Sequence, residues 1–288
     1  MKHKRFYAKL VAVVLLAALL VPSMAANAGE PRWTALASMR DSRLDFQTEV
    51  VDGQIYAIGG FDQNYDDLSS AEKYDPDTDT WTTLSSMSAA RSGFQTEVID
   101  GQIYAIGGSN PNGTLSSVEK FDPDTGTWTT VSSMWVARSQ FQTEVVDGKI
   151  YAISGGSTGY EASAEVYDPS TDTWTALSSM SIGRRFFQTE VLDGKIYAIG
   201  GSNSDVHLSS TEVFDLETDT WSTLSSMSKA RVNFQTEVFD GKIYAMGGRD
   251  ENYDLLSSVE VYDPDTDTWT ACTPMSEAKA HMGMTIVD

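Results

Sequence analysis

FQTEVIDGQIYAIGG, residues 94–108, decides the fold of this chain, because close copies of it return along the sequence. Its first five letters occur five times, beginning at Phe46, Phe94, Phe141, Phe187 and Phe234. A pair of glycines follows each copy, with spacings of 48, 48, 45 and 47 residues, at Gly59–Gly60, Gly107–Gly108, Gly155–Gly156, Gly200–Gly201 and Gly247–Gly248. A period of this length predicts one supersecondary unit used several times.

One unit, residues 94–134, contains four short stretches typical of β-strands. Residues 94–99 alternate large and polar side chains, and residues 103–106 form a short apolar run. Residues 118–121 and 128–131 complete the set. Asp-Gly between the first two stretches predicts a tight hairpin, and Asp-Pro-Asp between the last two predicts a turn. The unit therefore predicts a small antiparallel sheet of four strands.

Copies of such a sheet bury both faces when they wrap around an axis, which is the β-propeller arrangement. Each unit also holds an aromatic residue and, seven positions later, a tryptophan, and we expect these rings to fill the contacts between neighbouring sheets. The tryptophans are Trp81, Trp128, Trp174, Trp221 and Trp269. The predicted fold is thus all-β, with five complete four-stranded blades at about residues 43–87, 91–134, 138–180, 184–227 and 231–275.

The double glycine, the aromatic residue followed by Asp-Pro, and the tryptophan together resemble the kelch repeat over residues 33–288. Kelch repeats imply a propeller but no single function. Residues 32–39 match a fourth strand and residues 279–288 match a first strand. The resemblance therefore implies a partial sixth blade built from both termini. A truncated reading frame and a complete protein with a two-stranded closing blade both fit this pattern.

Residues 1–28 predict an export signal. Lys2, Lys4, Arg5 and Lys9 precede an apolar run of 12 residues, 10–21, and Ala26-Asn27-Ala28 fits a cleavage site. The run is short for a membrane span, and an uncleaved anchor is the alternative. We therefore expect residues 29–288 to form the exported propeller, in the medium, on the cell surface or in the periplasm, with no membrane span after cleavage.

The charge of the chain excludes one class of partner. Without the four basic residues of the signal, the chain has 16 Lys and Arg against 41 Asp and Glu, which gives a net charge of −25. A chain this acidic repels nucleic acid and anionic membranes. Cys272 is the single cysteine, so no internal disulfide forms, and we expect it to be a small buried residue.

Alternating strands sort the loops onto two faces of the propeller. The Asp-Gly and Asp-Pro-Asp turns repeat almost unchanged and define the uniform face. The loops between the second and third strands, and those entering the first strand, differ between units and define the variable face. Recognition commonly lies in such loops, with neutral drift as the alternative. The candidate ligand-binding residues are Asp45, Tyr65, Asn112, Gln140, Tyr160, Arg185, Phe186, His207, Asn233 and Tyr253.

Charged residues that recur in every unit predict structural pairs, because a catalytic group is needed only once. The arginines are Arg43, Arg91, Arg138, Arg184 and Arg231, and two sets of glutamates accompany them. We expect Arg–Glu pairs near the channel. An alternative is an arginine ring at the channel mouth that captures an anionic sugar.

No catalytic or metal-binding motif is found in the sequence. The Asp-Thr-Asp turns lack the Gly and Glu of a calcium loop, although weak calcium binding stays open. Galactose oxidase, a relative with this type of propeller, holds copper, but the mature chain has only His207 and His281, in unrelated contexts.

We therefore expect no cofactor and a monomeric, non-enzymatic propeller that binds a glycan or a protein. The alternatives are a sugar epimerase resembling sialic acid mutarotase, or a cell-surface structural module of a larger protein.

Overall fold

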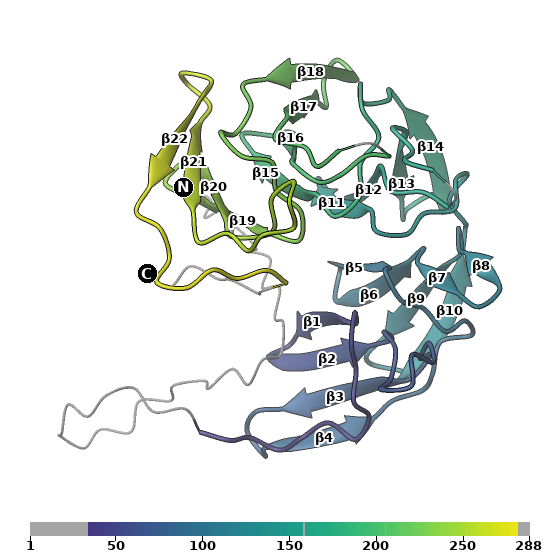
Figure 1. Cartoon of the computed structure of the whole chain (residues 1–288). Helices are drawn as coiled ribbons and strands as arrows, with labels where there is room; N and C mark the ends of the chain where they lie inside the picture. Colours follow the sequence, from purple (N-terminus) through teal and green to yellow (C-terminus); the bar gives the residue numbers. More distant parts are fainter. Residues whose placement is uncertain (1–33, 158, 205, 282–288) are drawn as a thin grey trace, which may run out of the picture.

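The computed structural model describes residues 34–157, 159–204 and 206–281. Within these ranges the regular structure consists of β-strands alone. Five four-stranded antiparallel sheets follow one another around a central axis (Figure 1). The prediction of an all-β propeller with five complete blades is confirmed. The predicted signal and residues 282–288 of the predicted closing blade lie outside the described residues, and residues 34–39 form no assigned strand.

Blade one contains β1 (Gln47–Val51), β2 (Gln54–Ile58), β3 (Ala71–Asp75) and β4 (Thr80–Thr83), and blade two contains β5 (Gln95–Ile99), β6 (Gln102–Ile106), β9 (Val118–Asp122) and β10 (Thr127–Val131). Blade three contains β11 (Gln142–Val146), β12 (Lys149–Ile153), β13 (Ala164–Asp168) and β14 (Thr173–Leu177), and blade four contains β15 (Gln188–Leu192), β16 (Lys195–Ile199), β17 (Thr211–Asp215) and β18 (Thr220–Leu224). Blade five contains β19 (Gln235–Phe239), β20 (Lys242–Met246), β21 (Val259–Asp263) and β22 (Thr268–Cys272). A two-stranded ribbon, β7 (Ser109–Asn110) and β8 (Gly113–Thr114), extends from blade two.

The local sequence explains the hairpins. Asp100 and Gly101 have φ angles of 50° and 75°, the left-handed pair that a two-residue turn needs, and they place Ile99 opposite Gln102. The four strands of blade two begin and end within one residue of the predicted stretches. The first strands β1, β5, β11, β15 and β19 line the axis (Figure 1).

The hydrophobic core lies between blades. Val51 and Tyr56 of blade one pack in one cluster with Phe94, Ile103 and Phe121 of blade two. Trp174 is buried in one such cluster, and Trp128, Trp221 and Trp269 pack against the others. All five tryptophans donate the indole N–H to a backbone carbonyl of the preceding blade or segment; the acceptors are Ala37, Ser85, Ser132, Ser178 and Ser225. The aromatic rings therefore fix one blade against the next, as predicted.

The third unit departs from the predicted glycine alignment. Ser154, with φ 60°, occupies the place of Gly107, and its O atom accepts from Arg138 as Gly107 accepts from Arg91. Gly155 is therefore the counterpart of Gly108, and Gly156 lies one position beyond the repeat. The predicted pair Gly155–Gly156 was wrong by one residue, because a serine interrupts the visible glycine pattern.

A substitution at Gly108 tests how closely the glycine turn packs against the loop that enters the first strand. A Cβ atom there would lie 2.6 Å from Cβ of Phe94 and 2.8 Å from the Ser92 carbonyl oxygen, whereas one at Gly101 meets nothing within 4 Å. Both positions have positive φ, so alanine costs about 1–2 kcal/mol of strain at either. We expect Gly108→Ala to lower the free energy of unfolding by about 1–3 kcal/mol more than Gly101→Ala, through overpacking. Equal losses in urea denaturation would contradict the packing described.

Cys272 is half-buried rather than buried, which corrects the expectation from sequence. Its counterparts Leu84, Val131, Leu177 and Leu224 pack against the core cluster that their blade shares with the next. Cys272 ends the last described strand, where no further four-stranded blade follows in the described residues.

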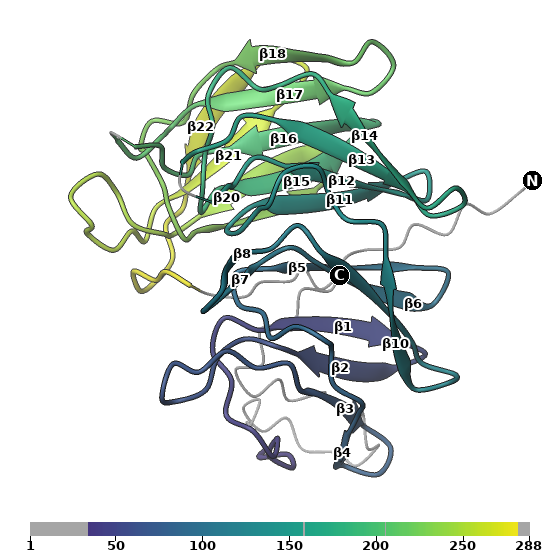
Figure 2. The ribbon, with the colours of Figure 1, turned by 90° about the vertical axis from the view of Figure 1, so that its right-hand side faces the viewer.

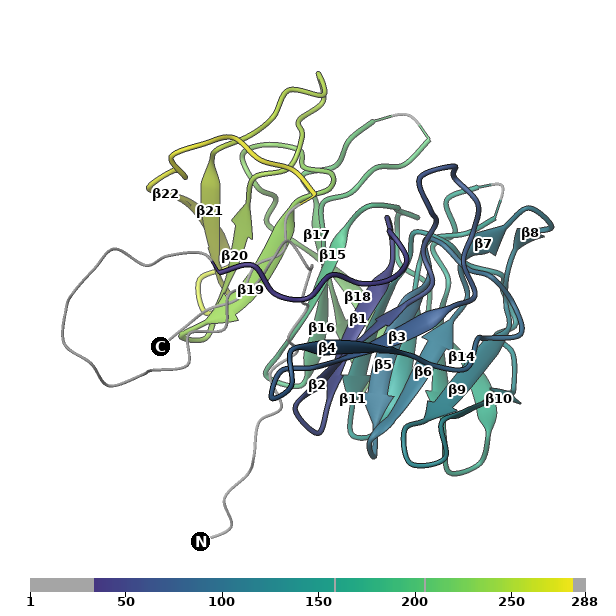
Figure 3. The same ribbon diagram turned by 90° about the horizontal axis from the view of Figure 1, so that it is seen from below.

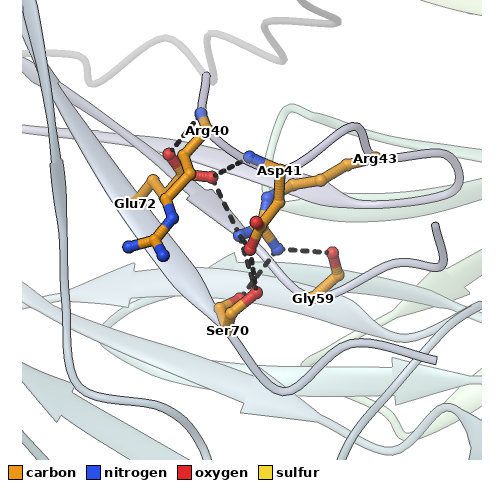
Figure 4. Close-up of polar contacts among 6 residues, drawn as sticks. All are labelled: Arg40, Asp41, Arg43, Gly59, Ser70 and Glu72. Carbon is orange, nitrogen blue, oxygen red and sulfur yellow. Dashed lines mark hydrogen bonds and ion pairs between the residues drawn. The ribbon is translucent and has the colours of Figure 1, made fainter. Parts of the chain in front are cut away.

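The side chain of each repeated arginine forms a buried cluster with residues of its own blade. Arg43 donates to the carbonyl oxygens of Gly59 and Ser70, at 3.0 and 2.8 Å, and to the Glu72 carboxylate at 3.1 Å (Figure 4). The backbone N–H groups of Arg40 and Asp41 donate to the same carboxylate. The four other arginines repeat this pattern with Glu119, Glu165, Glu212 and Glu260.

These clusters confirm the predicted Arg–Glu pairs and exclude the arginine ring. The side chains of all five arginines are 0% exposed, so none of them faces a ligand at the channel mouth. Their guanidinium groups instead donate hydrogen bonds to the carbonyl oxygens at the glycine turn and just before the third strand.

The pair Arg91–Glu119 predicts acid sensitivity. Burial alone would raise the pKa of Glu119, but hydrogen bonds from Arg91 and the Ser88 N–H hold it below its usual value, and the pKa of Glu260 is lowered in the same way. Burial lowers the pKa of Arg91, so desolvation of the guanidinium offsets part of the gain. A lowered carboxyl pKa stabilises the fold above the unfolded value of about 4.3, and this contribution is lost as pH falls through the folded pKa.

We therefore expect the urea midpoint to fall as the pH is lowered from about 5 to 3. The variant Glu119→Gln, which lacks one of these carboxyl groups, should show a shallower decline over the same range. A slope identical to that of the unchanged protein would contradict the assignment.

Candidate functional site at the channel mouth

The residue two positions after each repeated basic residue adopts a left-handed conformation. These residues define the channel-mouth ring: Asp45, Gly93, Gln140, Phe186, Asn233 and His281, with φ angles between 52° and 57°. Four of them are predicted site residues, and they come together because the first strands line the axis.

Backbone hydrogen bonds join neighbouring members of the ring. The N–H of Gln140 donates to the Gly93 carbonyl at 3.0 Å, and that of His281 donates to the Asn233 carbonyl at 3.0 Å. The N–H of Asn233 lies 3.4 Å from the Phe186 carbonyl. Repeated hydrogen bonds of one kind give the side chains of different blades a common rim.

Asp45 is an acid of this rim with a raised pKa. Its side chain is accessible to water, yet the surrounding channel walls desolvate it and raise its pKa. The Gly93 N–H, Gln140 and the charge of His281 oppose that shift without cancelling it. Nε2 of Gln140 lies 3.5 Å from the Asp45 carboxylate, and a Cβ at Gly93 would lie 2.7 Å from that Nε2. Glycine at position 93 therefore leaves the space in which Asp45 and Gln140 meet.

The ring combines groups that suit a polyhydroxylated ligand. Asp45 supplies an acceptor, Gln140 and Asn233 supply amides that donate and accept, and His281 supplies an imidazole. Phe186 is 38% exposed and offers an apolar face beside them. A few polar groups around an exposed aromatic ring are typical of small-molecule sites.

The loops between the second and third strands are bridged to the loops that enter the first strands. Isolated bridges join Leu44 to Phe61, Ser92 to Ser109, Ser139 to Gly156, Arg185 to Ser202 and Val232 to Arg249. Each bridge links the loop that enters a first strand to the loop that leaves the second strand of the same blade. Both sets therefore form one surface at the end of the molecule where β7 and β8 project, opposite the β5–β6 turn (Figure 2).

The remaining predicted residues lie on these outer loops and not in the ring. Arg185 sits over the Tyr160 ring at 5.1 Å and donates to the Gly156 carbonyl, which links blades four and three. His207 packs edge-on against Tyr253 at 4.7 Å and links blades four and five.

Two more predicted residues are exposed on single loops. Tyr65 is 77% exposed and stacks on Phe61 of its own loop. Asn112 is exposed in the turn between β7 and β8. The candidate residues predicted from the sequence thus fall into two neighbouring groups, the channel-mouth ring and a set of loop tips.

Gly93 and His281 were missed as site residues. Both stand at the same offset from the basic position of their unit, with Lys279 in the place of the repeated arginine. Aligning the last residues to that offset would have found His281. Nothing in the residue type of Gly93 signals that it provides space for its neighbours.

A hollow lies on the uniform face, away from this ring. It has a volume of about 480 Å³ and lies between blades two and three, where Asp100, Asp147, Lys149 and Asp168 line it. A second hollow of about 300 Å³ lies between blades one and two and is lined by turn residues of the same kind. Because the lining repeats between blades, we regard these hollows as grooves between hairpin ends.

Within the described ranges, no group of three His, Cys, Asp or Glu residues is arranged to hold a metal ion. The same residues include no helix that could cross a membrane.

Comparison with known families agrees with the repeat pattern. The kelch motif matches residues 42–88, 183–228 and 230–276, and the FKB95 kelch-repeats domain matches residues 84–198. The chain belongs to the kelch-repeat family. The solved structure of YjhT resembles this kelch propeller with a TM-score of 0.71 at 16% identity, over 85% of this chain and 89% of that one. At that identity the similarity shows the fold alone.

A curated relative shares one repeat with this kelch propeller. The F-box/kelch-repeat protein At1g67480 of Arabidopsis thaliana is 44% identical over 48 residues. The match spans 17% of this chain and only 13% of the relative, so the two proteins have a single unit in common by this measure.

Proposed function

We propose that this kelch propeller is an exported, non-enzymatic binding protein that recognises a glycan or a protein through its variable face. The channel-mouth ring carries the proposal, because five different side chains occupy equivalent positions of the repeat there, while the turns of the opposite face are nearly identical. The hydroxyl-binding groups beside Phe186 favour a glycan. The predicted signal at residues 1–28 supports export.

The experiment is a glycan array and a pull-down with folded protein, followed by affinity measurement on the best ligand. We expect Phe186→Ala to weaken binding at least about tenfold. Phe239→Ala is the matched control, since Phe239 is 46% exposed and lies beside the Asp-Gly turn of the uniform face. Blank results in both screens, or equal losses in the two variants, would overturn the proposal.

A second candidate is a sugar epimerase or mutarotase, favoured by one observation. Asp45 has a raised pKa and interacts electrostatically with His281 at the mouth, so an acid and a base face the same space. NMR of anomer exchange tests this candidate. Acceleration that is lost in Asp45→Asn would support it, and exchange at the uncatalysed rate would remove it.

A further inference from the structure

Trp135 is an exposed tryptophan at a position where the other units have a polar residue. It is 77% exposed, whereas the other tryptophans of the described ranges are buried or half-buried. Trp135 directly follows Met134, and the residues that follow the equivalent methionine of the other units are Arg40, Ser88, Ser181, Ser228 and Ser276. An indole at this position is therefore a feature of one unit and not of the repeat.

The repeat uses this position through its backbone and not through its side chain. The N–H of Trp135 donates to the Glu165 carboxylate at 2.7 Å, and the N–H of Ser181 donates to Glu212 at 2.8 Å in the same way. Serine thus suffices for the contact that the fold needs. Single exposed apolar residues are common on protein surfaces, but here a large aromatic side chain replaces a small polar one without a structural requirement.

A hydrogen bond holds the indole against the outer wall of the propeller, which consists of the fourth strands β4, β10, β14, β18 and β22 (Figures 1 and 3). Nε1 of Trp135 donates to the backbone carbonyl oxygen of Trp174, in β14, at 3.1 Å. This bond orients the ring while most of its surface stays in water. A side chain that is already oriented loses little conformational entropy when a ligand packs on it.

The surface around the indole is polar. Thr173 and Thr175, the neighbours of Trp174 along β14, are both exposed and carry hydroxyl groups that donate and accept hydrogen bonds. None of the other exposed large hydrophobic residues in the described ranges belongs to the outer wall. Trp135 is therefore a single apolar platform beside hydroxyl groups.

A sugar ring fits such a platform better than a protein does. The C–H face of a sugar packs on an aromatic ring, while its hydroxyl groups bond to polar neighbours. A stable protein interface instead buries about 800 Å² per partner around an apolar core, which a single exposed indole does not provide. The net charge of −21 for the whole chain repels acidic polysaccharides, so a neutral one is favoured.

We propose that Trp135 and the hydroxyl groups of β14 form a binding site for a neutral polysaccharide on the outer wall of blade three. The indole packs on one sugar ring, and the strand hydroxyls bond to the sugar beside it. The site is separate from the channel-mouth ring, because β14 is the strand of blade three farthest from β11, which lines the axis. It therefore does not rest on the function proposed for the channel mouth.

The test is native electrophoresis of the full chain in gels that contain hydroxyethyl cellulose, glucomannan or, as the acidic counterpart, polygalacturonate. We expect retardation in at least one neutral gel and none in polygalacturonate. Trp135→Ser should weaken binding at least about tenfold, because it removes the platform. Its circular dichroism spectrum should be unchanged, since serine occupies this position in four other units. The polysaccharide that binds should also shift the tryptophan fluorescence of the unchanged protein but not that of Trp135→Ser.

Phe239→Ala is the matched control, since Phe239 is an exposed aromatic residue of β19 and not of the outer wall, and it should be retarded as the unchanged protein is. Mobility unaffected by every neutral polysaccharide, or equal retardation of Trp135→Ser, would overturn the proposal, even if Trp135 proved necessary to capture a protein. Retardation lost in Phe186→Ala but kept in Trp135→Ser would also overturn it, while supporting recognition at the channel mouth.

Discussion

Replacing Arg138 with alanine is expected to lower the free energy of unfolding by about 3–5 kcal/mol. The guanidinium group donates to Ser154, Ser163 and Glu165, and its side chain is 0% exposed. Its removal leaves a carboxylate that is 2% exposed without its counter-charge, together with two carbonyls that have lost a donor. Urea denaturation at pH 7 measures the effect.

Lys149→Ala is the matched control for Arg138→Ala. Lys149 pairs with Asp168 at 2.9 Å in the same blade, but the two side chains are 44% and 27% exposed. Such a surface pair contributes about 0–1 kcal/mol. A loss below about 1 kcal/mol for Arg138→Ala would show that the buried cluster does not stabilise blade three.

Replacing Trp174 with alanine is the second change with a large expected effect, a loss of about 3–5 kcal/mol. Trp174 is 6% exposed, packs on Tyr167 with ring centroids 5.2 Å apart, and donates its indole N–H to Ser132 at 2.9 Å. The substitution removes a large apolar group and a hydrogen bond between blades two and three.

Two further variants separate these contributions. Trp174→Phe keeps most of the volume and loses the hydrogen bond, so it should cost about 1 kcal/mol. Trp135→Ala removes an indole that is 77% exposed and donates one hydrogen bond to the Trp174 carbonyl, so it should cost about 1 kcal/mol or less. A melting temperature of Trp174→Ala within one degree of the unchanged protein would place this ring outside the core.

The repeat made most of the fold predictable from sequence. Alternation, the Asp-Gly turn and the aromatic pair are short-range signals, so each strand of blade two could be placed within one residue. The Arg–Glu pairs followed from recurrence alone. The orientation of the arginines did not, since recurrence cannot distinguish a group that faces the channel from one buried within its blade.

The site was predictable only in part. Asp45, Gln140, Phe186 and Asn233 were identified from their offset, because that offset sets their distance from the axis. The separation of the ring from Tyr65, Asn112 and the other loop tips depends on loop conformation, which varies with loop length. Ser154 misled the alignment because it adopts the left-handed conformation that the repeat otherwise reserves for glycine.

Hydrogen–deuterium exchange with the selected ligand tests most directly whether recognition lies at the channel mouth. The proposal predicts slower exchange in the segments that carry Asp45, Phe186 and His281 when the ligand is bound. Exchange at the Asp-Gly turns of the uniform face should stay unchanged. Protection confined to those turns, or no protection at saturating ligand, would contradict the account.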